Sequence, residues 1–215
     1  KQNLQTWSLT GAVNKELTDE LVWKNRVNYN YGMNESEREI TFDNSNRTVK
    51  GDFNSWSAGA VTELEYSKKI NDIVTLRPTA GIAIDYLSQE GYTEKGADEL
   101  NLRVDSNNST STRVGAGIRA DVRAYKGKRS TLIITPRADY SYELGNPYED
   151  RNVQISAFED SIVLGEREAG KNYLNAGLDV EYKTNEKFSL YGGYDMDVLS
   201  ENKGYNVTAG FKYKF

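Results

Sequence analysis

Apolar and polar positions alternate along most of this chain with the two-residue period of a β-strand, not the 3.6-residue period of a helix. The clearest case is 204–215, where Tyr205 and every second residue after it are apolar, with Asn, Thr, Gly or Lys between them. The alternation recurs often enough to predict about eleven strands. They are expected at residues 7–13, 23–33, 56–66, 73–86, 100–104, 113–124, 132–142, 152–164, 174–182, 188–197 and 204–215.

The length of these strands separates two kinds of β architecture. Strands of soluble proteins most often have about five or six residues, whereas a tilted strand of about nine to eleven residues crosses the hydrocarbon core of a membrane. Several predicted strands, including 73–86 and 113–124, reach that length. Only a closed barrel satisfies every backbone group of a sheet in lipid. The pattern therefore predicts an all-β, antiparallel, up-and-down transmembrane β-barrel.

Charged residues, glycines and serines occupy the polar face of strand after strand. Closing the sheet with this face inward gives a hydrated lumen and turns the apolar face to lipid. The charges then either pair with one another and hydrate the lumen, which we favour, or contact a segment inside it. The residues predicted to line the lumen are Arg77, Asp85, Arg113, Arg119, Asp121, Arg123, Arg137, Asp139, Asp179, Glu181 and Lys212.

Two further residue types have expected places in such a barrel. Glycines on the polar faces either receive bulky neighbours from adjacent strands, the interpretation we favour, or relax the curvature of the sheet. They are Gly81, Gly117, Gly193 and Gly210. Aromatic residues near the ends of the apolar faces are predicted to lie at the two membrane interfaces. They are Trp7, Trp23, Trp56, Tyr66, Tyr86, Tyr142, Tyr182, Tyr194 and Tyr205.

Composition removes most catalytic chemistry. The 215 residues contain neither Cys nor His, which excludes disulfides, thiolate or imidazole metal sites, a cysteine nucleophile and a Ser-His-Asp triad. Asp195 and Asp197 could form an acid pair, and Asp43, Asn44 and Asp72 could suggest calcium, but a missing partner and the wrong spacing favour structural roles. A net charge of −5 argues against a nucleic-acid partner. No enzyme activity, cofactor or metal is expected.

The mean hydropathy of −0.72 would ordinarily describe a soluble domain. In a barrel it averages one lipid-facing side, one charged side and polar loops. No window approaches the length of a membrane-spanning apolar helix.

The last residues resemble the C-terminal signal of outer-membrane barrels, in which a polar residue and a glycine precede two aromatic residues and the final residue is Phe. The matching positions are Thr208, Gly210, Phe211, Tyr213 and Phe215. This resemblance implies recognition by the barrel assembly machinery and insertion into outer-membrane lipid.

More of the chain resembles the C-terminal translocator domain of classical autotransporters, the type V secretion family. The likeness covers most of the chain and is strongest at residues 76–86, 91–97, 100–104, 114–117, 177–182, 188–194 and 208–215. It implies a barrel of about twelve strands in the outer membrane of a Gram-negative bacterium, with the C-terminus in the periplasm. It also implies a helix through the pore and an N-terminal passenger exported to the cell surface.

The connections and the strand count give further expectations. Short connections at 17–20, 69–72, 106–109 and 184–186 are expected in the periplasm, and longer ones at 34–52, 88–98 and 199–203 outside the cell. Residues 39–42 and 47–50 are predicted to extend two strands above the membrane as a hairpin. Because single-chain bacterial barrels have an even number of strands, eleven strands imply one of two things: either the pore helix and first strand lie upstream of Lys1, or one doubtful segment is miscounted. We favour the first, so residues 1–215 are expected to be one translocator domain.

Three other function classes compete with this interpretation. An omptin-like outer-membrane protease needs a histidine, which the chain lacks. A soluble β-sandwich would show the same alternation but would stay in solution without detergent. A porin-like or adhesin-type barrel with no passenger stays open as an alternative, because its lumen and loops would have the same polarity.

Overall fold

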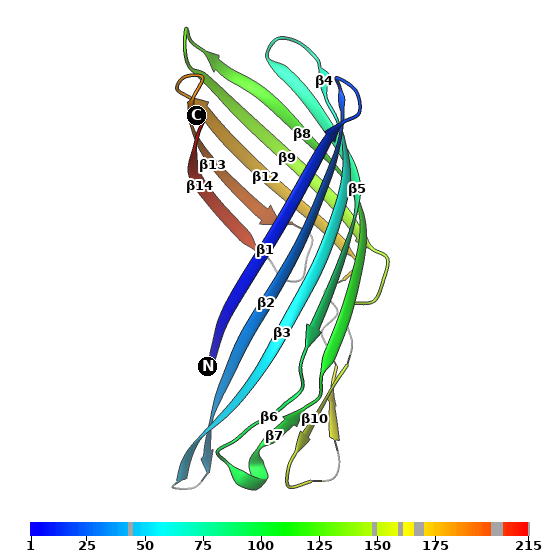
Figure 1. Ribbon diagram of the computed structural model, residues 1–215, viewed down its shortest axis with the longest axis vertical. Helices are drawn as coiled ribbons and strands as arrows, with labels where there is room; N and C mark the ends of the chain where they lie inside the picture. The colour runs from blue at the N-terminus through cyan, green and yellow to red at the C-terminus, as the bar shows by residue number, and fades with distance from the viewer. Residues whose placement is uncertain (43–44, 148–149, 159–160, 166–169, 199–203, 215) are drawn as a thin grey trace.

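The computed structural model describes residues 1–42, 45–147, 150–158, 161–165, 170–198 and 204–214. A single antiparallel sheet dominates these residues and curls into a half-barrel (Figure 1). Nine strands follow one another around the curl, and the two-residue β4 (Lys68–Lys69) adds to the edge of β5. In order they are β1 (Gln2–Glu16), β2 (Leu21–Phe42), β3 (Ser45–Tyr66), β5 (Val74–Gln89), β8 (Asn107–Lys126), β9 (Thr131–Glu143), β12 (Asn172–Lys183), β13 (Phe188–Asp197) and β14 (Tyr205–Tyr213).

The register between strands keeps one face apolar from strand to strand. Leu64 lies opposite Ala80, Ala80 opposite Ala116, and Ala116 opposite Tyr140. A slip of one residue would move every apolar side chain of a strand to the other face. The alternation in the sequence therefore restricts the pairing to registers that keep the apolar residues on one face. The prediction of an all-β antiparallel fold is confirmed.

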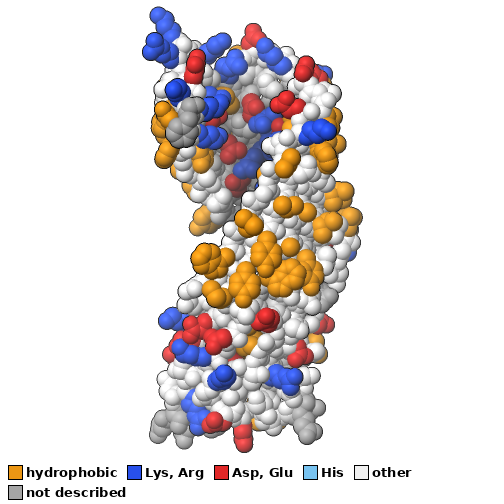
Figure 2. All heavy atoms as spheres, viewed as in Figure 1, with side chains coloured by type: hydrophobic (Ala, Val, Ile, Leu, Met, Phe, Trp, Pro, Cys, Tyr) orange, Lys and Arg blue, Asp and Glu red, His pale blue; other side chains and the backbone are white. Residues whose placement is uncertain are grey.

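The sheet does not enclose an apolar core. Among the described residues, the buried hydrophobic side chains are only Val49, Ala97, Val104 and Val153. Large apolar residues of the outer face are instead exposed, and Leu9 and Val207 keep 74% and 70% of their surface accessible. Figure 2 shows hydrophobic side chains in a band across the outer surface at mid-height. Such a surface is stable in hydrocarbon and not in water.

The two ends of the sheet differ. Residues 17–20, 67–73, 127–130 and 184–187 connect neighbouring strands at the end that we call the turn end, where Lys214 N–H also donates to Lys187 O at 2.8 Å. The opposite end, the loop end, carries longer connections. There β2 and β3 pair without interruption from Leu21 opposite Tyr66 to Phe42 opposite Ser45, which confirms the predicted hairpin.

A second sheet of four short strands stands at the loop end. It contains β6 (Tyr92–Thr93), β7 (Leu102–Val104), β10 (Arg151–Ile155) and β11 (Ser161–Leu164), with the 3-10 helix η1 (Asp98–Leu100) between β6 and β7. Its order, β6-β7-β10-β11, repeats that of β5, β8, β9 and β12, to which these strands are joined along the chain. Lys50 and Lys95 exchange backbone hydrogen bonds of 3.0 and 2.8 Å, so this sheet, the loop tier, continues the wall beside β3.

The loop tier holds the buried apolar residues. Val49 is fully buried, and Phe53 stacks on Tyr92 with ring centroids 4.6 Å apart. Glu94 is only 4% exposed and accepts hydrogen bonds from Arg38 Nη2 at 2.6 Å and Leu102 N–H at 2.9 Å. A buried carboxylate with several donors holds its surroundings rigidly. The loop tier is therefore a folded unit and not a set of loose loops.

The loop tier corrects three predictions. Residues 100–104 and 152–164 were expected to cross the membrane, but their strands, β7, β10 and β11, belong to the loop tier, so nine strands of the eleven remain in the wall. The connection at 106–109 was expected at the turn end, but it opens β8 at the loop end. Alternation alone cannot tell a short strand of a loop from a spanning one. The connection at 199–203 lies outside the described residues.

Helices add nothing to a membrane span. Within the described ranges, no helix is long and apolar enough to cross a bilayer.

Candidate functional site

Charged side chains gather on the inner face of the curled sheet. Figure 2 shows acidic and basic groups inside the hollow of its upper half. A groove of about 460 Å³ follows this face and is lined by residues of β2, β3, β5, β8, β9, β12 and β13, among them Arg26, Glu63, Asp85, Arg113 and Asp139. The inner face is therefore polar and open enough to hold water.

One cluster of charged side chains joins four strands near the turn end. Glu65 of β3 is 4% exposed and lies 2.6 Å from Lys24 Nζ of β2, 3.5 Å from Arg77 Nη1 of β5 and 3.3 Å from Arg119 Nη1 of β8. Arg77 also reaches Asp121 at 2.7 Å. Each charge faces an opposite charge, which offsets part of the cost of removing the carboxylate from water.

A second cluster of charged side chains joins β9, β12, β13 and β14 in the C-terminal half of the sheet. Arg137 of β9 contacts Asp195 of β13, and its Nε lies 3.2 Å from Asp179 Oδ2 of β12. Lys212 of β14 lies 3.5 Å from Glu181 of β12. One of these ion pairs joins the neighbouring strands β9 and β12, and the other two reach across an intervening strand, so together they tie β9, β12, β13 and β14 along the inner face.

The structure brings most of the predicted lumen residues together. Ten of the eleven form ion pairs on the inner face: Arg77, Asp85, Arg113, Arg119, Asp121, Arg137, Asp139, Asp179, Glu181 and Lys212. Arg123 instead donates to the carbonyl of Asp72 at 2.9 Å, at the turn end. That these residues line a water-filled pore stays a prediction.

Sequence reasoning missed several inner-face charges, among them Lys24, Arg26, Glu63 and Glu65. Their strands were predicted, and the phase of each alternation puts them on the same face as the other charges. The partners, however, depend on which residues the register places opposite each other, and that information is not local.

The two aspartates that could have suggested catalysis have structural partners. Asp195 pairs with Arg137, and Asp197 accepts a hydrogen bond from Asn175 Nδ2 at 3.2 Å. In the part of the chain that the structure describes, no group of three or more acidic side chains could hold a metal ion. The inner face shows charge pairing and no arrangement of nucleophile and base.

The inner-face glycines accept side chains from neighbouring strands. A Cβ at Gly117 would overlap the Asp139 carboxylate, one at Gly193 the Asp179 carboxylate, and one at Gly210 the Tyr191 ring. Gly81 differs, because its Cβ would meet the backbone carbonyl of Thr62. The contacts at Gly117, Gly193 and Gly210 fit the packing role that we favour, whereas Gly81 marks a close approach of the β3 backbone.

The nine predicted interface aromatics lie on the outer face. Trp56 stacks on Tyr29 at 6.3 Å and lies 5.0 Å from Tyr86 between ring centroids, nearer the loop end. Near the turn end, Trp23 donates to Thr62 at 2.7 Å and Tyr66 to Glu20 at 2.8 Å. Eight of the nine are exposed, from 37% at Tyr66 to 80% at Tyr205, and Tyr86 is half-buried. The other six exposed residues are Trp7, Trp23, Trp56, Tyr142, Tyr182 and Tyr194. Contact with the membrane interfaces stays a prediction.

The residues of the C-terminal signal divide between the two faces of β14. Phe211 and Tyr213 point outward and are 69% and 52% exposed, and Phe211 stacks on Phe188 at 6.0 Å. Thr208 and Gly210 alternate with them on the inner face. Phe215 lies outside the described residues.

Comparison with known proteins decides the family. The model of the autotransporter β-domain family matches residues 1–195 of this chain. This chain belongs to the autotransporter β-domain family. The predicted resemblance is therefore confirmed, and with it an outer-membrane barrel fold.

Relatives and solved structures agree with this assignment. The chain is 24% identical over 193 residues to an extracellular serine protease of Serratia marcescens and 24% identical over 172 residues to BigA of Salmonella typhimurium, covering 87% and 77% of this chain. It spans only 18% and 8% of those two proteins. The translocator domain of the autotransporter NalP from Neisseria meningitidis has the same fold, with a TM-score of 0.70 at 16% identity, over 100% of this chain and 67% of that one.

Proposed function

We propose that this autotransporter β-domain anchors an N-terminal passenger in the outer membrane and helps to export it to the cell surface. The match of the family model over residues 1–195 carries this proposal. The wall suits the task because its outer face is apolar and its inner charges are held in ion pairs. Paired charges hydrate a path without offering free groups that would retain a passing polypeptide.

We infer that upstream segments complete the barrel, namely a pore helix and further wall. Among the described residues, β1 and β14 form the two edges of the sheet and do not pair with each other. An unpaired strand edge in lipid costs several kcal/mol for each unsatisfied backbone group. The backbone groups along both edges must therefore find partners. The described residues supply nine wall strands, so a barrel of twelve strands needs three more.

We propose that the turn end and the C-terminus face the periplasm. Outer-membrane barrels have short periplasmic turns and longer extracellular loops. The backbone N–H of Lys214 donates to the carbonyl of Lys187 at the turn end, and the loop tier stands at the opposite end. This orientation exposes the loop tier at the cell surface.

We further propose that the barrel assembly machinery recognises β14 through Gly210, Phe211, Tyr213 and Phe215. The two described aromatics of this set are accessible on the outer face. The domain itself is proposed to have no enzyme activity, because it lacks His and Cys and its acid pair is occupied by Arg137 and Asn175. Any catalysis then belongs to the passenger.

Surface display tests the function. The natural full-length protein, tagged with an epitope upstream of residue 1, is expressed in a Gram-negative cell, and protease is added to intact cells. We expect loss of the tag while the barrel stays protected, and a tag placed in the 127–130 turn serves as the internal control. A gene that encodes no passenger, together with an open conducting channel in planar bilayers, would contradict the proposal and favour a porin-like barrel.

A further inference from the structure

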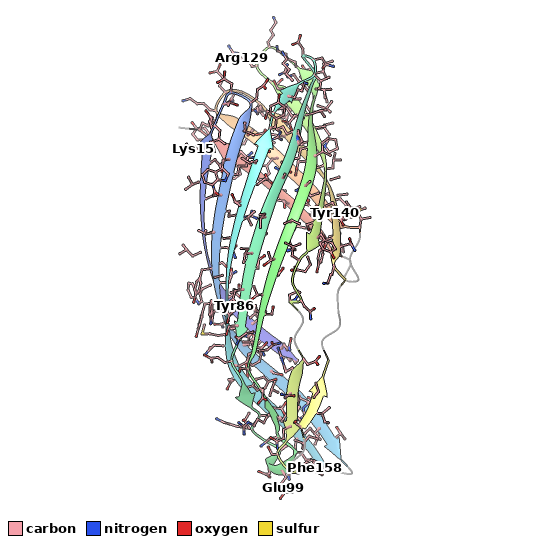
Figure 3. The ribbon with its side chains drawn as sticks, turned by 90° about the vertical axis from the view of Figure 1, so that its right-hand side faces the viewer. Lys15, Tyr86, Glu99, Arg129, Tyr140 and Phe158 are labelled. Carbon is pink, nitrogen blue, oxygen red and sulfur yellow. The ribbon has the colours of Figure 1, made fainter. Side chains whose placement is uncertain are left out.

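The turn end carries a group of cations that form no ion pair with another described residue. Lys126, Lys128 and Arg129 stand at the β8–β9 connection, Lys187 at the next turn and Lys214 after β14. All five are exposed. Figure 3 places Arg129 at the end of the molecule opposite Glu99 and Phe158. We call these five residues the basic rim.

In the rest of the turn end, the cations Lys15, Lys68 and Lys69 are outnumbered by the acidic residues Glu16, Asp19, Glu20 and Asp72. Lys69 is occupied by Asp72 at 2.6 Å. Hydrogen bonding to Lys69 lowers the pKa of Asp72, and the charges of Arg123 and Lys126 act in the same direction. Positive potential is therefore concentrated under β8 to β14 in a chain whose net charge is −5.

The basic rim begins where the lipid-facing surface ends. Lys126 follows Tyr125, Lys187 precedes Phe188 and Lys214 follows Tyr213, and Tyr125 and Tyr213 are 54% and 52% exposed on the outer side of the sheet. Aromatic rings of this kind sit at headgroup level. One residue adds about 3.3 Å along a strand, and lysine and arginine extend their charged ends further toward water. The cations therefore lie at the depth of lipid phosphates.

We propose that the basic rim binds the headgroups of anionic phospholipids in the leaflet at the turn end. Guanidinium binds phosphate through two parallel hydrogen bonds, and lysine binds it as a compact charge. The adjacent aromatic rings hold the glycerol and acyl region of the same lipid. Identification of this leaflet as the periplasmic one rests on the orientation proposed above, but binding itself does not.

Selective lipid retention tests this proposal. The natural full-length protein is reconstituted in nanodiscs of equal parts phosphatidylglycerol and phosphatidylcholine, released into detergent and examined by native mass spectrometry. We expect bound phosphatidylglycerol to exceed phosphatidylcholine, with a contribution of about fivefold per engaged cation. A triple variant, K126Q/K128Q/R129Q, is expected to lose most of this excess. Its fold is checked by heat-modifiable gel mobility, because these exposed turn residues make no ion pair that folding requires.

A variant with the same change in charge provides the control. K15Q/K68Q/K69Q removes three cations from the other half of the turn end and is expected to keep the phosphatidylglycerol excess. Inorganic phosphate at tens of millimolar should not displace the lipid, which separates a lipid site from a free phosphate site. Equal retention of both lipids by the unmodified barrel, or equal loss in both variants, would overturn the proposal. Surface display of a passenger is a separate measurement, so either proposal can fail alone.

Discussion

At the scale of single residues, the inner face is organised by register and not by local sequence. Glu65 lies between Leu64 and Tyr66 in an ordinary alternating strand, yet the pairing of β2, β3, β5 and β8 places three cations around it. Gly81 looks like other strand glycines, yet the backbone of β3 lies against it. The sequence predicts only that Glu65 and Gly81 lie on the polar face of their strands. The residues that they contact depend on the register.

Removing the charge of Glu65 should weaken the wall. In E65Q, Lys24, Arg77 and Arg119 lose their shared partner, and the loss of a charged hydrogen-bond network typically costs about 1–3 kcal/mol. We expect the midpoint of urea unfolding of the detergent-solubilised barrel to fall accordingly. D19N, at an exposed turn, is the control and should leave the midpoint unchanged. An unchanged midpoint for E65Q would show that the charge cluster around Glu65 does not stabilise the fold.

Glycines on the two faces should respond differently to alanine. In G81A the new Cβ meets the Thr62 carbonyl, which cannot move without shifting β3, so we expect a loss of about 1–3 kcal/mol. In G192A the nearest neighbour, the Thr208 carbonyl, is at an ordinary contact distance of 3.6 Å, and stability should change little. The same unfolding measurement checks both variants, and equal effects would rule out close backbone approach at Gly81.

At the scale of elements, the wall could be predicted from the sequence and the loop tier could not. A spanning strand repeats its alternation over many residues, and its neighbour is the next strand along the chain. The loop tier joins segments as distant as β6 and β11 through strands of two to five residues, too short for a reliable period. Its resemblance motif at 91–97 now has a physical basis, since Gly96 adopts φ +119° against the Thr48 carbonyl and Glu94 anchors Arg38.

A disulfide should form between β3 and the segment after β6. Lys50 and Lys95 exchange two backbone hydrogen bonds, and such antiparallel pairs have Cα atoms about 5.5 Å apart, within the range of a disulfide. Because the chain has no other cysteine, K50C/K95C should oxidise to a single species of faster mobility on non-reducing gels. The control K50C/K171C joins positions on different parts of the loop end and should stay reduced. A free thiol count of two after mild oxidation of K50C/K95C would mean that the loop tier does not hold this pairing.

At the scale of the whole molecule, the curled sheet has no interior in the usual sense, and its stability depends on what surrounds each face. The outer face needs hydrocarbon, and the inner face needs water and ion pairs. The hydrophobic side chains that are buried among the described residues lie in the loop tier or against it. A soluble sandwich would bury the same apolar residues uniformly. A bilayer does not, because its polarity changes with depth.

Arginine substitutions along one strand can measure that depth dependence. Leu174 and Leu178 both belong to the apolar face of β12, but Leu174 is near its loop end and Leu178 near its middle. An outward arginine costs about 2–4 kcal/mol at the bilayer midplane and about 0–1 kcal/mol near an interface. We therefore expect L178R to lower the folding free energy in phospholipid vesicles far more than L174R, as measured by denaturant titration of tryptophan fluorescence. In a soluble core both variants would be comparably destabilised, so equal losses would contradict a lipid-facing β12. A larger loss at Leu178 would place the centre of the membrane near the middle of the wall, between the two sets of outer-face aromatics.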